Sequence, residues 1–165
     1  MSGLAVDNFL LSFAVAFGQL AGQAIDAVRP RSMWLYQAVE ADSTGLYTVI
    51  RPYNMPADPV GQTGRQPSLS VQLDTRGMVC GAVYAESARL AELLRDPAGG
   101  DGPPRWRWAV AGKKMIGGAI AADPAGSWIV NSVLPVSGPG LTGVDDQGRF
   151  MASSNFDLVF YFSAA

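Results

Sequence analysis

Two segments of the chain place large apolar residues at every second position, and the first of them alternates strictly with polar residues, the pattern of a half-buried β-strand. In residues 68–75, Leu69, Val71 and Leu73 face one way, and the polar residues between them face the other. In residues 150–162 the apolar face carries Phe156, Leu158, Phe160 and Phe162. Each predicted strand therefore turns one face toward a core, which other elements of the chain must cover.

Two further segments repeat apolar residues at steps of three and four, which predicts amphipathic helices that supply this cover. The first is expected over residues 4–27, before Pro30, with the stripe Val6, Phe9, Leu10, Phe13, Phe17, Leu20 and Ala24. The second is expected over residues 79–95, before Pro97, with the stripe Val79, Val83, Leu90, Leu93 and Leu94. The fold depends on both helices docking, because each buried large side chain contributes about 1.5–3 kcal/mol.

The remaining segments are predicted as strands and loops. Residues 32–39 and 46–50 are expected to form a hairpin closed by a turn at 40–45. Three more strands are expected over 105–111, 114–121 and 127–134, with a bulge or bend at Gly117-Gly118. Long loops are expected over 51–67 and 135–149, and loops of this length are usually functional or disordered.

This order of elements predicts the fold class. Strand runs joined by short turns favour a mostly antiparallel sheet, and the two helices are expected on one of its faces, which is an α+β architecture. A chain of 165 residues without an internal repeat or a linker fits one domain over residues 1–165.

The chain is poor in charge, with 16% charged residues against 48% hydrophobic ones. Interface cores lose charge, so an oligomer with part of its surface covered explains this composition, although a chain merely rich in small residues explains it equally well. The net charge of −2 and the scattered Lys and Arg residues give no reason to expect sequence-independent binding to nucleic acid.

Catalytic and membrane roles are not favoured. The chain has no histidine and one cysteine, Cys80, so Ser-His-Asp and Cys-His sites are excluded and the commonest transition-metal ligand is missing. We expect no enzyme activity and no cofactor. The apolar run 9–17 is far shorter than the ~20 residues of a membrane span and lacks a preceding positive charge, so we expect a buried helix of a soluble, cytoplasmic protein.

Several short patterns have a chemical and a plain interpretation, and the plain one is favoured for each. Asp145-Asp146 before Gly148 resembles part of a cation loop but lacks enough oxygen ligands, so a β-turn at 146–148 is expected. The glycine-rich run 137–140 does not match a phosphate loop. Asp74, Glu86 and Glu92 are interpreted as surface charges, and the Arg-Trp alternation at 105–108 as a strand. The alternative for residues 105–108, stacking of the aromatic side chains on bases of a single-stranded nucleic acid, is not favoured.

The C-terminal third resembles a known family. The run Ser-Gly-Pro-Gly-Leu-Thr-Gly-Val-Asp-Asp-Gln-Gly-Arg-Phe at 137–150, followed by Ser-Asn-Phe-Asp-Leu-Val-Phe at 154–160, is similar to tail-terminator proteins of long-tailed bacteriophages. These are often labelled minor capsid or tail-completion proteins. The order of helices and strands upstream fits the same family loosely. The Pro-rich stretch at 51–67 departs from its pattern, as does the absence of basic residues to line a DNA channel.

This resemblance implies a tail-terminator-like fold and a structural virion protein, assembled in the host cytoplasm. It would form a hexameric ring at the head-proximal end of the tail tube, end tube polymerisation and join the tail to the head connector. Its partners would be copies of itself, the tail-tube protein and the connector, with genome DNA passing through the lumen without specific binding. Another neck or tail-tube protein is an alternative. A small-molecule-binding domain with a pocket lined by Tyr36, Tyr47, Trp106 or Trp108 is a further one.

Closed rings need head-to-tail contacts, and the two expected loops are the candidates to make them. The residues expected to touch a neighbouring subunit or the tube are Tyr53, Met55, Arg65, Pro139, Leu141, Asp145, Asp146 and Arg149. Arg65 and Arg149 are expected to pair with Asp145 or Asp146 across the seam between subunits, although exposed pairs contribute only ~0–1 kcal/mol.

Overall fold

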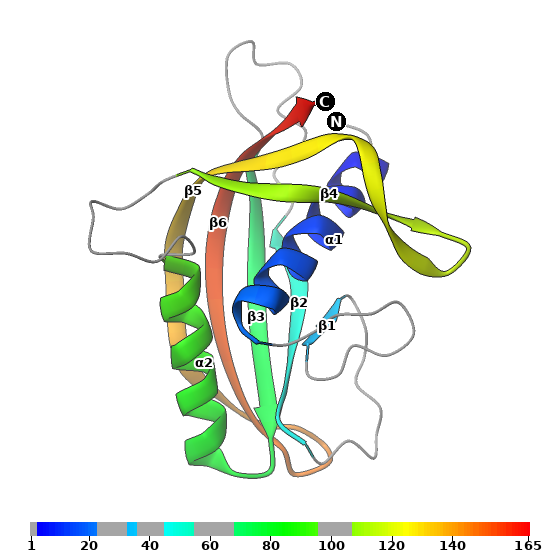
Figure 1. Ribbon diagram of the computed structural model, residues 1–165. Coiled ribbons are helices and arrows are strands. Elements are labelled where there is room, and N and C mark those ends of the chain that lie inside the picture. The colour runs from blue at the N-terminus through cyan, green and yellow to red at the C-terminus, as the bar shows by residue number, and fades with distance from the viewer. Residues whose placement is uncertain (1–2, 23–32, 36–44, 55–67, 96–106) are drawn as a thin grey trace.

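A computed structural model describes residues 3–22, 33–35, 45–54, 68–95 and 107–165 (Figure 1). They form two helices, α1 (Gly3–Leu20) and α2 (Cys80–Arg95). The strands are β1 (Met33–Leu35), β2 (Tyr47–Asn54), β3 (Ser68–Gly77), β4 (Trp108–Ile116), β5 (Ala119–Val144) and β6 (Phe150–Ala164). The expected α+β class is confirmed.

The strands form one curled sheet in the order β1-β2-β3-β6-β5-β4, and every neighbouring pair except β1–β2 is antiparallel. The predicted hairpin over 32–50 is wrong, because β1 lies parallel to β2 with Met33 opposite Thr48. A two-strand hairpin requires antiparallel neighbours, whereas a parallel pair needs a longer crossover connection. The sequence pattern showed the strands but not their direction relative to each other.

The longest element is β5, which runs for 26 residues and replaces a predicted loop. Residues 135–144 were expected in a loop but pair with β6, so only 145–149 connect the two strands. Irregularities in register at four places let the Pro- and Gly-rich part of β5 stay in the sheet. The predicted strand over 114–121 is divided by a turn at Gly117-Gly118, where both glycines have positive φ and close the β4–β5 hairpin.

Helix α1 ends at Leu20, seven residues before the predicted end, and Ala21 and Gly22 form a turn. Gly22 has a φ of +74°, which favours glycine, and its N–H donates to the carbonyl of Gln19. Leu20 is accordingly more than a third exposed, and Ala24 lies outside the described residues. Ser12 joins the helix to the sheet, because its Oγ accepts a 2.8 Å hydrogen bond from the backbone N–H of Lys113 on β4.

Helix α2 confirms the predicted segment closely, and its buried side includes Val83, Leu90 and Leu94. Val79 was expected on the same stripe, but it precedes the helix and is exposed. Within the described residues, neither helix has the length and apolar character needed to cross a bilayer.

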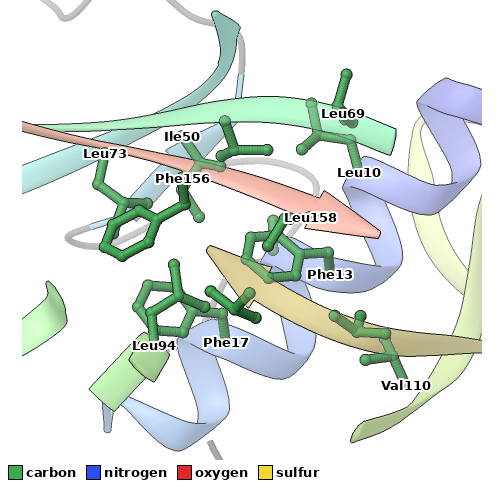
Figure 2. Close-up of a cluster of buried hydrophobic side chains, with 14 of the residues drawn as sticks. Leu10, Phe13, Phe17, Ile50, Leu69, Leu73, Leu94, Val110, Phe156 and Leu158 are labelled. Atoms are coloured by element: carbon green, nitrogen blue, oxygen red, sulfur yellow. The ribbon is translucent and has the colours of Figure 1, made fainter. Parts of the chain in front are cut away.

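Both helices lie on one face of the sheet, as expected, and share one core (Figure 1). Phe9 of α1 stacks on Phe160 of β6 with ring centroids 3.6 Å apart, and the edge of Trp128 meets both rings. Side chains of α1, α2 and strands β2, β3, β4, β5 and β6 make up this core. Figure 2 shows part of it, with the labelled side chains Leu10, Phe13, Phe17, Ile50, Leu69, Leu73, Leu94, Val110, Phe156 and Leu158. Phe162 was expected in this core but is 41% exposed near the end of β6.

Candidate interaction surface

The turn between β5 and β6 is held by the side chain of Asp145. Its Oδ1 accepts the backbone N–H groups of Gln147 and Arg149, each at 3.0 Å. Its Oδ2 accepts Arg149 Nε at 2.7 Å. The predicted turn at 146–148 is confirmed, with Gly148 at a φ of +75°. The Asp145 side chain therefore stabilises the connection 145–149 through hydrogen bonds to its backbone and to Arg149.

The ion pairs continue from this turn across the face of the sheet opposite to α1 and α2. Arg76 on β3 contacts Asp145 Oδ2 at 3.4 Å and Asp74 Oδ2 at 2.8 Å, and Arg51 on β2 contacts Asp74 at 3.2 Å. We call Arg51, Asp74, Arg76, Asp145 and Arg149 the charged corner. Asp74 was predicted to be a surface charge, but it is buried. The prediction was wrong because Arg76, two residues along β3, and Arg51, on the adjacent β2, both bind the Asp74 carboxylate and allow its burial.

Tyr47 lies beneath the charged corner and is buried on the face opposite to α1 and α2. The guanidinium of Arg149 covers its ring, with the Cζ atom 5.6 Å from the ring centroid, a cation–π distance. Burial raises the pKa of the Tyr47 hydroxyl above its usual value of 10.0, although Arg149 and Arg76 oppose this shift. Arg149 itself is only 4% exposed, so it acts as a buried structural cation.

Burial alone would raise the pKa of Asp145. The hydrogen bonds from the backbone and the guanidinium of Arg149, and from the backbone of Gln147, outweigh burial and hold the pKa of Asp145 below its ordinary value of 3.8. The Asp145 carboxylate is therefore charged at neutral pH. Arg76 and Arg149 of the same subunit balance this charge.

The predicted contact residues are distributed unevenly. Asp145 and Arg149 bind each other within the chain, which replaces the pairing expected across a seam. Asp146 is exposed at the tip of the turn, Leu141 is exposed on β5, and Pro139 is partly exposed beside it. Tyr53 lies in β2, where only its backbone is described, and Met55 and Arg65 lie outside the described residues.

Sequence reasoning missed an apolar surface at the end of the sheet near the charged corner. Register places Leu46 beside Gly77, Gly77 opposite Phe150, and Phe150 opposite Val144, so four strands end side by side. The exposed residues there are Leu46, Met78, Val79 and Val144, with exposed fractions from 38% to 65%. We call these four residues the sheet end. The sequence offered only a weak signal, since Leu46 and Val79 were assigned to a predicted strand and helix and Val144 to a predicted loop.

A second apolar surface missed by sequence reasoning is the tip of the β4–β5 hairpin. Met115 and Ile116 are each at least half exposed immediately before the Gly117-Gly118 turn. Figure 1 shows this hairpin extending past α1 on the side away from α2, while the sheet end lies near the β3–α2 connection. We call Met115 and Ile116 the hairpin tip.

Between these surfaces, one edge of β5 is paired with no other strand among the described residues. Pairing with β4 stops at Val130, so residues 131–144 pair only with β6 among the described strands. The large exposed side chains there are Leu134, Val136 and Leu141. Pro135 and Pro139 cannot donate a backbone hydrogen bond, and prolines and irregular register are devices that prevent an edge from recruiting a foreign strand.

Chemical sites are sparse in the part of the chain that the structure describes. It contains no group of three or more His, Cys, Asp and Glu side chains close enough to hold a metal ion. An open groove of about 450 Å³ runs between α1 and β4, lined by Val15, Ala16, Gln19, Trp108 and Ala111 among others. Tyr47, expected to line a pocket with Trp108, lies instead under Arg149, and Tyr36 and Trp106 lie outside the described residues.

Comparison of the chain with protein-family models, with curated proteins and with solved structures finds no match in any of the three. The function is therefore inferred from the chain's own surfaces: a charged corner whose ions pair within the subunit, and apolar side chains exposed at the sheet end, at the hairpin tip and along β5 between them.

Proposed function

We propose that this protein is a structural virion subunit that forms a ring at the head-proximal end of a phage tail tube. The ring ends tube polymerisation and joins the tail to the head connector. No bond-making step belongs to this role, and DNA passes through the lumen without specific binding.

One observation carries the proposal: large apolar side chains are exposed at both ends of β5, in a chain with 16% charged residues. Isolated exposed apolar residues are ordinary, but groups of them mark contact sites. Two different apolar surfaces on one subunit suit head-to-tail contacts, which generate rings when the rotation between subunits closes.

The resemblance to tail terminators supports the same role. The residues that carry it, 137–150 and 154–160, lie in the part of the β5–β6 hairpin that contains the Asp145 turn. Pro139, Leu141 and Asp146 are accessible on this hairpin and are the proposed contacts to the tube or the connector.

Electron microscopy tests the proposal at two scales. Negatively stained purified protein should show rings with a central opening, and an antibody to the chain should label intact particles at one site between head and tail. Labelling along the whole tail would instead identify a tube protein. Absence of both rings and particle labelling would refute a structural role in the virion.

The groove between α1 and β4 favours one second candidate, a small-molecule-binding domain. Its volume of about 450 Å³ falls in the range of ligand pockets, and Trp108 offers an aromatic wall. A thermal-shift screen against metabolites tests it. A ligand whose stabilisation is lost in Ala16→Trp, which would fill the groove, would support binding there, and no shift with any metabolite would exclude it.

A further inference from the structure

We propose that the groove between α1 and β4 binds a small molecule that carries a single carboxylate on an elongated apolar body, such as a medium-chain fatty acid. The walls of the groove contact the apolar body, and the ammonium group of Lys113 pairs with the carboxylate. The inference rests on the second candidate function, because it names the ligand class for the same groove, and it is independent of the ring.

The walls of the groove are apolar and are held in place by the core. On the sheet side, the ring of Trp108 meets the ring of Phe13 edge-on, with centroids 5.9 Å apart, which fixes the indole against α1. On the helix side, Val15 and Ala16 line the groove, and Ala111 lines it from β4. The small alanine side chains leave space beside the larger ones, so an apolar body can be buried there without rearrangement of the walls.

Lys113 is the one charged side chain among the described residues that line the groove. It is partly buried, and its ammonium group makes no ion pair with any described residue. The neighbouring Lys114 differs on both points, since it contacts Asp123 at 3.6 Å and does not line the groove. Covering an unpaired ammonium with an apolar ligand has a desolvation cost, and a carboxylate on the ligand would offset it.

The shape of the groove places this charge toward one end. Ser12 Oγ accepts the backbone N–H of Lys113 at 2.8 Å and donates to the carbonyl of Asn8 at 2.6 Å, so the buried hydroxyl is already occupied within the chain. From Ser12 the groove follows α1 to Leu20, roughly 12 Å of helix at 1.5 Å per residue. A ligand with its charge at one end and an extended apolar chain matches this arrangement.

Two other ligand classes are disfavoured by the same residues. A cation would meet Lys113 and no acidic side chain among the described residues that line the groove. Sites for phosphate groups combine several basic side chains or use a helix N-terminus. This groove offers one lysine and lies along residues 12–20, toward the C-terminal end of α1, where the helix dipole is negative. A single carboxylate is therefore the anion that fits.

Calorimetric titration of the purified protein with three ten-carbon probes tests the role of charge. Decanoate, 1-decanol and decylamine share one apolar chain and differ in the head group. We expect one decanoate bound per chain, binding of decanol about tenfold weaker, and no binding of decylamine. Decylamine that binds as tightly as decanoate would overturn the proposal.

Shortening the chain of the probe tests the role of the apolar walls. Octanoate lacks two methylenes of decanoate and should bind about fourfold to fifteenfold more weakly, because each methylene is at least partly buried. Equal affinities of octanoate and decanoate would show that the walls do not contact the ligand, and would also overturn the proposal.

Substitution of Lys113 separates its charge from the rest of the groove. Lys113→Met keeps an apolar stem and removes the ammonium, so the affinity for decanoate should fall about tenfold and that for decanol should stay the same. Lys114→Met is the matched control and should change neither affinity. Equal losses of decanoate affinity in the two variants would mean that general surface charge attracts the probe, which contradicts the inference.

Filling the groove tests its location. Ala111→Phe, at an exposed position on β4, should abolish decanoate binding while the circular dichroism spectrum stays that of the parent. Ala109→Phe, at the other exposed alanine of β4 in the groove, serves as a second variant if the first does not fold. Full decanoate binding by a folded variant of this kind would overturn the assignment of the site.

The outcomes separate this inference from the proposed functions. Decanoate and decanol that bind equally, and only while the groove is unfilled, would overturn the ligand class and leave the groove as a binding site. No binding of any of the three ten-carbon probes would overturn the inference, and the metabolite screen then decides the second candidate function separately. Ring formation is measured by microscopy, and none of these titrations bears on it.

Discussion

The two hairpins that end β5 differ in how their turns are stabilised. The β5–β6 turn is fixed by side chains, since Asp145 binds two backbone N–H groups and the buried Arg149, which also covers Tyr47. The β4–β5 turn depends on two glycines with positive φ and carries exposed apolar residues instead. The charges of the β5–β6 turn are paired inside the subunit, whereas Met115 and Ile116 at the β4–β5 turn remain exposed.

The difference shows that a charged residue in a turn is a poor guide to a contact with another subunit. Charges have a large desolvation cost when they are buried, so a fold that buries them must pair them internally. Apolar side chains carry no such requirement and can stay half exposed until a partner covers them. The residues expected to form the seam, Asp145 and Arg149, belong to the first kind, and Met115 and Ile116 to the second.

The largest effect is expected from Arg149→Ala. It removes the cover over Tyr47 and leaves the shielded Asp145 carboxylate without its closest cation, so the free energy of unfolding should fall by about 3 kcal/mol. Urea unfolding measures this. Asp146→Asn, one residue from Asp145 but exposed, is the control and should change stability by less than about 0.5 kcal/mol. Equal effects of the two substitutions would contradict the internal role of the corner.

A smaller loss is expected from Gly138→Ala, close to the same end of β5. Gly138 has a φ of +85°, and an added Cβ would collide with the Ser153 carbonyl on β6. The substitution should cost about 1–3 kcal/mol in urea unfolding. Gly140→Ala is the matched control, because a Cβ there meets nothing within 4 Å. If both variants were as stable as the parent, the close approach of β5 to β6 would not matter for stability.

Lowering the pH should reduce the contribution of the Asp145 carboxylate to the free energy of unfolding. The folded-state pKa of Asp145 is lowered, so its contribution is complete above the ordinary value of 3.8 and is lost as the pH falls through the folded value. Between about pH 5 and about pH 2, the parent should therefore lose more unfolding free energy than Asp145→Asn, whose amide does not titrate. Parallel losses in the two proteins would show that the Asp145 carboxylate is not linked to folding.

The smallest effect on stability is expected at the other hairpin. Met115→Ser with Ile116→Ser should change the unfolding free energy of the dissociated subunit by less than about 0.5 kcal/mol, because both side chains are already half exposed. Urea unfolding at a protein concentration low enough to keep the subunits apart measures this free energy. A loss as large as that of Arg149→Ala would mean that the tip stabilises its own subunit, and the contrast between the hairpins would fail.

The sequence patterns predicted what depends on local periodicity and missed what depends on distant partners. Helix α2, strand β3 and the buried side of β6 follow from alternation or helical spacing within each segment. The parallel pairing of β1 with β2 and the passage of β5 through a Pro- and Gly-rich stretch depend on neighbouring strands. Asp74 depends on both kinds of partner, since Arg51 lies on the adjacent β2 and Arg76 lies only two residues away on β3.

The candidate site follows the same division. The turn at 146–148 was predicted because Asp and Gly have turn chemistry of their own. Asp146 and Leu141 are exposed, and their role as contacts stays a prediction. The sheet end was not predicted, since Leu46, Met78 and Val144 become neighbours only through the register of four strands. Each of them alone in the sequence is an unremarkable apolar residue beside a turn.

Self-association is the central claim, and sedimentation velocity over a range of protein concentrations measures it most directly. We predict one closed species with the mass of six 17.4 kDa chains, which does not grow further as the concentration rises. A protein that sediments as the single 17.4 kDa chain at every concentration would contradict the account.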